Sequence, residues 1–258
     1  MSEPAPFVAG EPTGEPAWRI LLEVLGLWLG VNGVIWGARL VYEATKGMGS
    51  GWQLVLAVVP ILFMYVPVLV CKWRGVDSWA YPLALPALRD WKVWKPVLKW
   101  NAIFIGVIVV PFVAGYHVWH VHILQDVRIE AGFPVLWPTI GSTLLLIGYH
   151  LFFVAIPEEF FYRGYLQTRL DELFGRKWSV FGTLVGPGLL IATVIFAFGH
   201  TLVVYQWWHV FIIGPGLIFG WLRARTGDVM AGAFFHAWCN VTVTTLDVMY
   251  GLQSLQGG

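Results

Sequence analysis

Hydrophobic residues along the chain gather into long runs that are separated by polar segments. A helix needs about 20 apolar residues to cross the hydrocarbon core of a bilayer, because each residue adds about 1.5 Å. Runs near this length fall at residues 20–38, 52–71, 100–119, 136–157, 188–205, 208–222 and 229–249. The pattern predicts an all-α fold, a polytopic transmembrane bundle of about seven helices. The number can be six or eight, since the 208–222 run is short and rich in glycine.

No long linker and no internal repeat divides these runs, which favours one transmembrane domain over residues 18–250. Residues 1–17 contain proline and glutamate but no lysine or arginine. A secretory signal begins with basic residues, so we expect a disordered tail here instead. Residues 251–258 are expected to form a short C-terminal tail. Residues 178–187 are expected to be a surface or re-entrant stretch.

Composition places the chain in the membrane. It is 58% hydrophobic and only 12% charged, whereas soluble domains are about 25% charged. Trp and Tyr, which favour membrane interfaces, number 16 and 9. We therefore expect an integral membrane protein with membrane lipids around it. A net charge of +1 supplies no basic field for nucleic acid.

Basic residues indicate the orientation of the bundle. They concentrate in three segments, residues 72–99, 163–177 and 223–225, which fall on one side if the runs alternate. The positive-inside rule makes that side cytoplasmic and places the N-terminus there. Arg39, Lys46 and Arg128 lie on the other side but are fewer. Residues 78–96 mix Trp, Pro and Lys, which fits either a plain cytoplasmic loop or a segment on the membrane surface.

Two adjacent carboxylates, Glu158 and Glu159, end one of the apolar runs. A charged side chain at membrane depth costs about 2.5–3.5 kcal/mol on insertion scales, so it indicates a functional site with a partner nearby. Candidate partners follow in the second half of the chain: Arg163, His200, His236 and Asn240.

Helix geometry predicts that these residues meet. Glu159 precedes the charged turn 171–177 by about 12 residues, or about 18 Å. His200 follows the helix-breaking Gly186-Pro187-Gly188 by a similar length, and His236 and Asn240 lie about 12–18 Å into the last run. The polar residues of three helices thus reach a similar depth. Glu159 and Arg163 are also spaced i, i+4, which lets them pair.

The chemistry of this set favours a water nucleophile. It holds no Ser or Cys with a base at motif spacing, which disfavours covalent acyl transfer. One glutamate can act as a general base while a histidine orients the water, and the second histidine and the asparagine can stabilise an oxyanion. The residues favour a peptide-bond hydrolase inside the membrane. No cofactor is expected. A zinc protease stays an alternative, since Glu and His ligate zinc, although the HExxH signature is absent.

Three motifs resemble a known family. Glu158-Glu159-Phe-Phe-Tyr-Arg163 matches EExxxR, Phe196 to His200 matches FxxxH, and His236 to Asn240 matches HxxxN. In this order they resemble the CPBP intramembrane proteases, which include the type II CAAX prenyl endopeptidases and bacteriocin-immunity homologues. The resemblance covers a motif-bearing core of about residues 145–245.

The resemblance implies roles for the motif residues. Glu158 would activate water with His200, and His236 with Asn240 would form the oxyanion site. Glu159 and Arg163 would position and balance the base. It further implies a glutamic-type hydrolase in a bacterial inner membrane, with a membrane-anchored or lipid-modified protein as substrate. Myxosortase-like members of the family suggest processing of a C-terminal sorting signal. We expect the substrate to enter laterally or from the cytoplasmic face.

Other functions remain as alternatives. A non-catalytic immunity factor or membrane scaffold of the same fold would tolerate loss of the carboxylates. A transporter or proton relay would show broken helices in both halves, whereas the polar residues here lie in one half. His117, His120 and His122 favour an interfacial polar stretch over a metal site. His150 is expected to pack in the bundle, and Glu23 has no assigned role. The pattern does not predict the oligomeric state.

Overall fold

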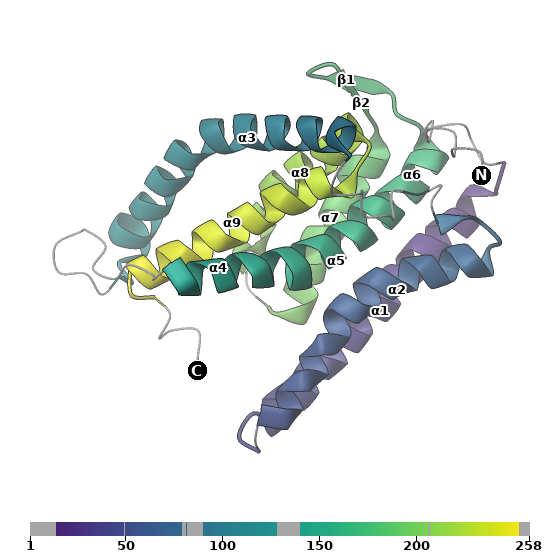
Figure 1. The fold of residues 1–258 in the computed structure, drawn as a ribbon. Coiled ribbons are helices and arrows are strands. Elements are labelled where there is room, and N and C mark those ends of the chain that lie inside the picture. Colours follow the sequence, from purple (N-terminus) through teal and green to yellow (C-terminus); the bar gives the residue numbers. More distant parts are fainter. Residues whose placement is uncertain are drawn as a thin grey trace.

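The computed structural model describes residues 14–48, 50–78, 81, 90–127, 140–205 and 207–252. The α-helices are α1 (Ala17–Thr45), α2 (Val58–Trp73), α3 (Trp91–His117), α4 (Ile140–Tyr149), α5 (Ile156–Glu159), α6 (Gln167–Phe174), α7 (Pro187–Val203), α8 (Ile213–Thr226) and α9 (Val229–Met249) (Figure 1). Five further helical segments are 3-10 or π in type: η1 (Ser50–Ala57), η3 (Val118–Leu124), η4 (His150–Ala155), η5 (Phe160–Leu166) and η6 (Trp207–Ile212).

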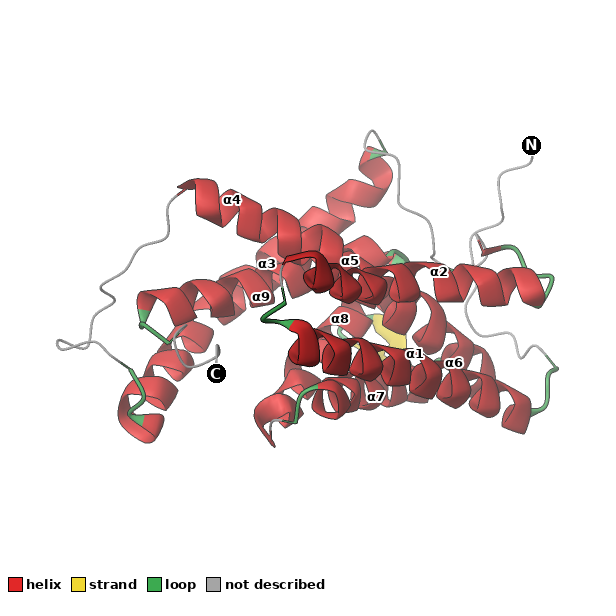
Figure 2. Ribbon diagram, turned by 90° about the horizontal axis from the view of Figure 1, so that it is seen from below, coloured by secondary structure: helices red, strands yellow, loops and turns green. Residues whose placement is uncertain are grey.

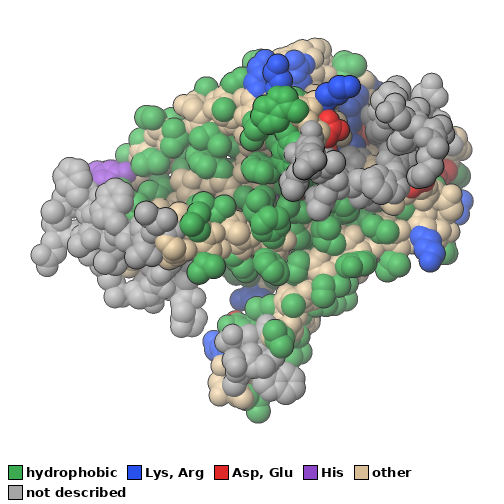
Figure 3. Space-filling view, viewed as in Figure 1, with side chains coloured by type: hydrophobic (Ala, Val, Ile, Leu, Met, Phe, Trp, Pro, Cys, Tyr) green, Lys and Arg blue, Asp and Glu red, His purple; other side chains and the backbone are tan. Residues whose placement is uncertain are grey.

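These segments join into seven helices in the part of the chain that the structure describes, which confirms the all-α prediction. The segment η1 runs into α2, η3 extends α3, and α4 to α6 form one continuous rod with η4 and η5. Five helices are long and apolar enough to cross a membrane: Ala17–Thr45, Leu54–Trp73, Trp91–Leu124, Gly141–Phe174 and Val229–Met249. Many large hydrophobic side chains on them are exposed, including Val110 and Leu145. Figure 3 shows hydrophobic side chains spread widely over one face of the molecule.

The bundle has a central group of helices with two flanks. Helix α8 packs on both α7 and α9, and the α4–α6 rod packs on α7 and α9. The α1–α2 pair covers one flank, where α1 contacts α7 and α2 contacts α5 (Figure 2). Helix α3 arches over the opposite flank and contacts α8 and α9 (Figure 1). This arrangement places α5 in the middle of the molecule.

Local sequence explains where the central helices begin and end. The Asp228 side chain accepts a hydrogen bond from the Met230 amide at 2.7 Å and so caps the first turn of α9. Gly227 ends α8 in the left-handed region, at φ 76°, which glycine adopts without steric penalty. Pro157 has no N–H to continue the α-helical ladder, and π-helical segments flank the short α5 that contains it.

The expected surface stretch at residues 178–187 forms an antiparallel hairpin. Its strands are β1 (Trp178–Val180) and β2 (Thr183–Val185). The turn residues Phe181 and Gly182 both have positive φ, 48° and 72°, as a tight two-residue hairpin requires. The hairpin was not predicted, but it leaves α7 to begin at Pro187, close to the predicted start of that helix.

A network of ion pairs ties together the end of the bundle where α1 begins. Arg169 contacts three carboxylates: Glu23 at 2.9 Å, Glu172 at 2.6 Å and Glu15 at 3.1 Å. Arg74 also pairs with Glu15, at 2.9 Å. Burial acts to raise the pKa of Glu15, but the hydrogen bonds from Arg169 and Arg74 outweigh it and lower the pKa. The network gives Glu23 a structural role, joining α1 to α6.

The predicted tails and domain boundaries stay predictions. Residues 1–13 and 253–258, and most of the predicted surface segment 78–96, lie outside the described residues. Within the predicted N-terminal tail, Glu15 is described and belongs to the ion-pair network.

Candidate active site

Three helical rods bring the six predicted site residues to the middle of the bundle. Glu158 and Glu159 lie in α5, and Arg163 follows one turn later in η5. His200 lies near the end of α7, and His236 and Asn240 lie on α9. The similar depths inferred from helix rise therefore correspond to real proximity for most of the set.

Glu158 faces both imidazoles. Its Oε2 atom lies 3.8 Å from Nε2 of His200 and 3.9 Å from Nε2 of His236. Its side chain is 13% exposed, so it is largely shielded yet reachable from a cavity. These separations are too long for direct hydrogen bonds and suit groups that share a water molecule or a substrate atom.

A backbone contact orients His200. Its Nδ1 atom lies 2.9 Å from the carbonyl oxygen of Phe196, four residues earlier on α7. A proton on Nδ1 donates to that oxygen, and this leaves Nε2 as an acceptor toward Glu158 in the neutral ring. The Phe196 ring also packs edge-on against His200, with the centroids 4.7 Å apart. The FxxxH spacing thus places both contacts on one helix face.

Glu159 and Arg163 form a fully buried ion pair. Nη1 of Arg163 lies 2.9 Å from Oε1 of Glu159, and neither side chain is exposed to solvent. The guanidinium also donates to the Gly216 carbonyl at 3.1 Å and lies over the Phe196 ring, 4.1 Å from its centroid. Arg163 therefore offsets part of the free-energy cost of burying the Glu159 carboxylate.

His236 is held from two sides. Its Nδ1 atom lies 3.2 Å from Oε1 of Glu159, and its ring stacks on Phe219 with the centroids 4.7 Å apart. Close packing at Gly232, one turn earlier on α9, allows this contact. A Cβ atom there would come within 2.8 Å of Oε2 of Glu159. Glu159 therefore positions His236, while Glu158 faces the open side of the site.

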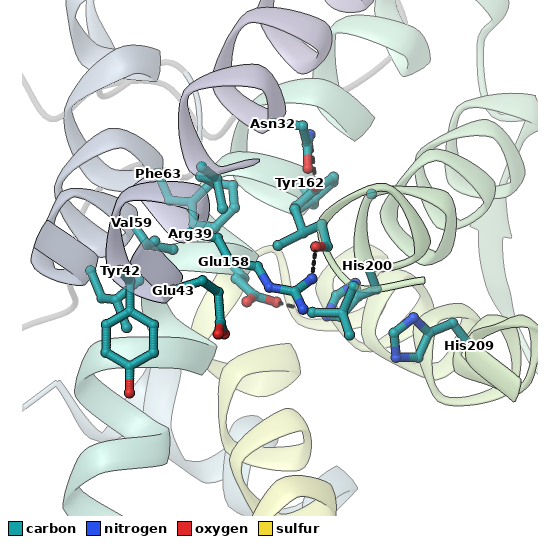
Figure 4. Close-up of a pocket in the computed structure, with 15 residues that line it drawn as sticks. Asn32, Arg39, Tyr42, Glu43, Val59, Phe63, Glu158, Tyr162, His200 and His209 are labelled. Atoms are coloured by element: carbon teal, nitrogen blue, oxygen red, sulfur yellow. Dashed lines mark hydrogen bonds and ion pairs between the residues drawn. The ribbon is translucent and has the colours of Figure 1, made fainter. Parts of the chain in front are cut away.

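Two cavities meet at these residues. The larger, about 440 Å³, is lined by Glu158 and His200 together with residues of α1, α2 and α7 (Figure 4). The smaller, about 280 Å³, is lined by His200, His236 and Asn240 with apolar residues of α3, α8 and α9. His200 contributes to both. Glu158 lines only the larger cavity, so the two cavities adjoin at His200.

The larger cavity extends away from the ion-pair network. Its lining includes Tyr42 and Glu43 near the end of α1, Leu56 in η1 and His209 in η6. These residues lie beside the α1–α2 and α7–α8 connections, whereas Arg74 and Arg169 lie at the other end of the bundle. The larger cavity thus extends toward the end of the bundle opposite Arg74 and Arg169, and the expected entry of substrate laterally or from the cytoplasmic face stays a prediction.

The remaining histidines make local contacts. His117 lies 2.8 Å from the Tyr250 hydroxyl, and His120 lies 3.0 Å from Asp126. His150 lies 3.3 Å from the Thr244 hydroxyl, within the bundle as expected. Within the described ranges, no three His, Cys, Asp or Glu side chains are grouped so as to hold a metal ion.

Sequence reasoning missed two contributors to the site. Asn32 on α1 donates to the Tyr162 hydroxyl at 3.4 Å and so joins α1 to the helix that carries the glutamates. Arg39, about two turns further along α1, lines the larger cavity. Both lie in the N-terminal half, which carries none of the three motifs, so only the packing of α1 could identify them.

Membrane-length helices around a buried set of carboxylates, imidazoles and one arginine define a polytopic membrane protein with an internal polar site. Residues 140–242 match the family model described as type II CAAX prenyl endopeptidase Rce1-like. The matched segment contains all three motifs and supports membership of the CPBP family of intramembrane proteases. The matched family is a family of proteases, which is consistent with an intramembrane peptidase, and the five membrane-length helices indicate an integral membrane protein. In the comparisons with curated proteins and with solved structures, nothing matches.

Proposed function

We propose that the protein hydrolyses a peptide bond by means of a water molecule that Glu158 activates together with His200. The observation that carries this proposal is the position of Glu158 Oε2, 3.8 Å and 3.9 Å from Nε2 of His200 and His236 at the wall of a cavity. A carboxylate and an imidazole acceptor at this spacing can share one water, with the carboxylate as the general base.

The reaction balances with the residues present. The water oxygen attacks the carbonyl carbon, and its proton passes to Glu158. The resulting oxyanion accepts hydrogen bonds from the Asn240 amide and from His236 when Nε2 carries a proton. Glu158 then returns the proton to the leaving amine as the carbon–nitrogen bond breaks. The Glu159–Arg163 pair takes no part in proton transfer and positions His236.

Metal-assisted hydrolysis by the same residues is the alternative that the geometry favours less. Three protein ligands around one ion are typical of catalytic zinc, and no such group occurs among the described residues. We therefore route no step through a metal. Retention of activity after prolonged treatment with a zinc chelator supports this assignment, and loss restored specifically by added zinc would overturn it.

The proposed substrate is a membrane-anchored or lipid-associated protein, cleaved near its end, and a C-terminal sorting signal fits this description. The proposed location is a bacterial inner membrane with the N-terminus in the cytoplasm. In that orientation the larger cavity extends toward the outer side, because its lining follows α1 from Asn32 to Glu43, near the C-terminal end of that helix. Substrate would then approach from the outer side or laterally from the lipid.

The proposal is tested in cells by comparing the wild type with Glu158→Gln and His200→Ala at matched membrane levels. Mass spectrometry of the N- and C-terminal fragments of membrane proteins is the readout. Defined fragments that vanish in both variants support the protease and identify the substrate. An unchanged fragment profile, with a phenotype that survives both substitutions, would instead favour the non-catalytic scaffold or immunity factor.

A further inference from the structure

The larger cavity contains a cation that the three motifs do not include. Arg39 of α1 lines this cavity together with Glu158 and His200. Figure 4 shows its side chain reaching from α1 toward those two residues. The side chain is half-buried, so its charge is neither deeply enclosed nor fully in solvent. Most of the other lining residues are apolar.

The guanidinium of Arg39 uses only some of its N–H donors within the protein. It hydrogen-bonds to the carbonyl oxygen of Val203, the last residue of α7. Arginine carries five N–H donors in a planar fork that matches a carboxylate. Among the described residues, no carboxylate lies within ion-pair distance of Arg39, and the nearby Glu43 pairs with Lys46 at 2.9 Å. The guanidinium thus keeps unused donors, while the carboxylates of Glu43 and Glu158 on the same cavity lining partly balance its charge.

Helix geometry sets the position of Arg39 relative to Glu158. Helix α1 runs antiparallel to the α4–α6 rod, because Glu23 contacts Arg169 while Asn32 contacts Tyr162. From the Asn32–Tyr162 level, Arg39 lies seven residues further along α1, or about 10 Å. Glu158 lies four residues in the same direction, or about 6 Å. Arg39 is thus nearer the cavity mouth than Glu158.

We propose that Arg39 binds the C-terminal carboxylate of the peptide substrate and so selects bonds close to the chain end. This inference rests on the proposed function. An extended peptide advances about 3.3–3.6 Å per residue. A chain whose terminal carboxylate pairs with Arg39 therefore reaches Glu158 within a few residues. A charged anchor at one end of a largely apolar cavity also disfavours internal segments, which have no terminal backbone carboxylate.

Two other roles for Arg39 make different predictions. As a cap for the end of α7 it would affect folding and all substrates alike. As a contact for a lipid phosphate it would make cleavage depend on the bilayer and not on the peptide terminus. The peptide carboxylate is favoured because Arg39 lines the same cavity as the proposed catalytic glutamate.

The test uses the purified full-length protein in phosphatidylcholine nanodiscs and a peptide library made by digesting a proteome. One half of the library keeps free C-terminal carboxylates and the other half is amidated. Mass spectrometry gives the distance of each cleaved bond from the C-terminus, and selected peptides give kcat and KM. The variants are Arg39→Gln, Arg39→Lys and, as a control at the same helix end outside the cavity, Lys46→Gln.

The wild type is expected to cut at a narrow range of distances from the C-terminus and to prefer free acids about tenfold to a hundredfold, mainly through KM. Arg39→Gln should lower cleavage of free acids to the level of amides and leave amides unchanged. Arg39→Lys should keep part of the preference, and Lys46→Gln should keep all of it.

Three results would contradict the proposal in distinguishable ways. Equal cleavage of acids and amides by the wild type, abolished by Glu158→Gln, overturns the carboxylate site while the protease stands. Equal losses for both peptide classes in Arg39→Gln assign the residue to the end of α7 or to lipid. Absence of any Glu158-dependent cleavage overturns the proposed function itself.

Discussion

The buried Glu159–Arg163 pair provides the sharpest prediction about how the site is built. Both side chains are 0% exposed, and their charged atoms lie 2.9 Å apart. The Arg163→Met substitution keeps an apolar chain of similar length but leaves the Glu159 carboxylate without its partner. Breaking a buried pair in this way costs about 3–5 kcal/mol. The folding equilibrium should therefore shift by a factor of about a hundred to several thousand.

A double-mutant cycle separates this effect from lost packing. The Glu159→Gln/Arg163→Met variant carries no buried charge at these positions, so it should recover most of the stability lost by Arg163→Met alone. The free energy of unfolding can be followed by tryptophan fluorescence as denaturing detergent is titrated into mixed micelles. Lys95→Met, which removes an exposed charge on α3, serves as the control and should change stability by less than about 0.5 kcal/mol.

The reasoning would be refuted if Arg163→Met cost less than about 1 kcal/mol, or if the double variant were as unstable as the sum of its two single variants. The first result would mean that the Glu159 carboxylate is uncharged or is in contact with water. The second would mean that the two side chains act independently despite their contact.

Two further predictions concern packing and pH. Gly232→Ala places a Cβ atom 2.8 Å from Glu159 Oε2, so the displacement of His236 should lower peptidase activity by at least about tenfold. Gly30→Ala, which has open space around it, is the control and should not change activity. Cleavage rates at matched membrane levels measure both variants, and a fully active Gly232→Ala variant would contradict the packing argument. The pKa of Glu15 is lowered from its ordinary value of 4.5, because hydrogen bonds from Arg169 and Arg74 outweigh the effect of burial. The contribution of Glu15 to folding stability should therefore be fully present above pH 4.5 and be lost as the pH falls through the lowered pKa. Detergent unfolding should therefore find Glu15→Gln less stable than the wild type near neutral pH and nearly equal to it in strong acid; a difference that persists in acid would argue against the ion pairs.

Hydrophobic periodicity predicted most of the helical framework. The run at residues 229–249 matches α9 in both bounds, and the run at 188–205 differs from α7 by two residues or fewer. The run at 136–157 was predicted too short, because helical structure continues past the glutamates to Phe174. Residues in that continuation, such as Arg163 and Arg169, look like a cytoplasmic segment by charge alone, but their charges are paired inside the bundle.

Helix rise was enough to place the motif residues at one depth, but not to say which atoms face each other. That Glu158 faces the cavity while Glu159 pairs with Arg163 depends on the rotation of α5 and on the small residues Gly216 and Gly232 opposite it. The β-hairpin, the contacts of Glu23 and the cavity position of Arg39 depend on partners far away in the chain. A single sequence carries no direct signal for such pairings.

The central claim is that Glu158 activates the water that hydrolyses the peptide bond. The most direct measurement is the cleavage rate of a peptide from the cellular fragment screen by the purified protein, comparing the wild type with Glu158→Gln. Glu43→Gln, which removes a carboxylate elsewhere on the lining of the same cavity, is the matched control. The account predicts that Glu158→Gln lowers kcat by at least about a hundredfold with little change in KM, and that Glu43→Gln retains kcat. A Glu158→Gln variant that cleaves at the wild-type rate would contradict the claim.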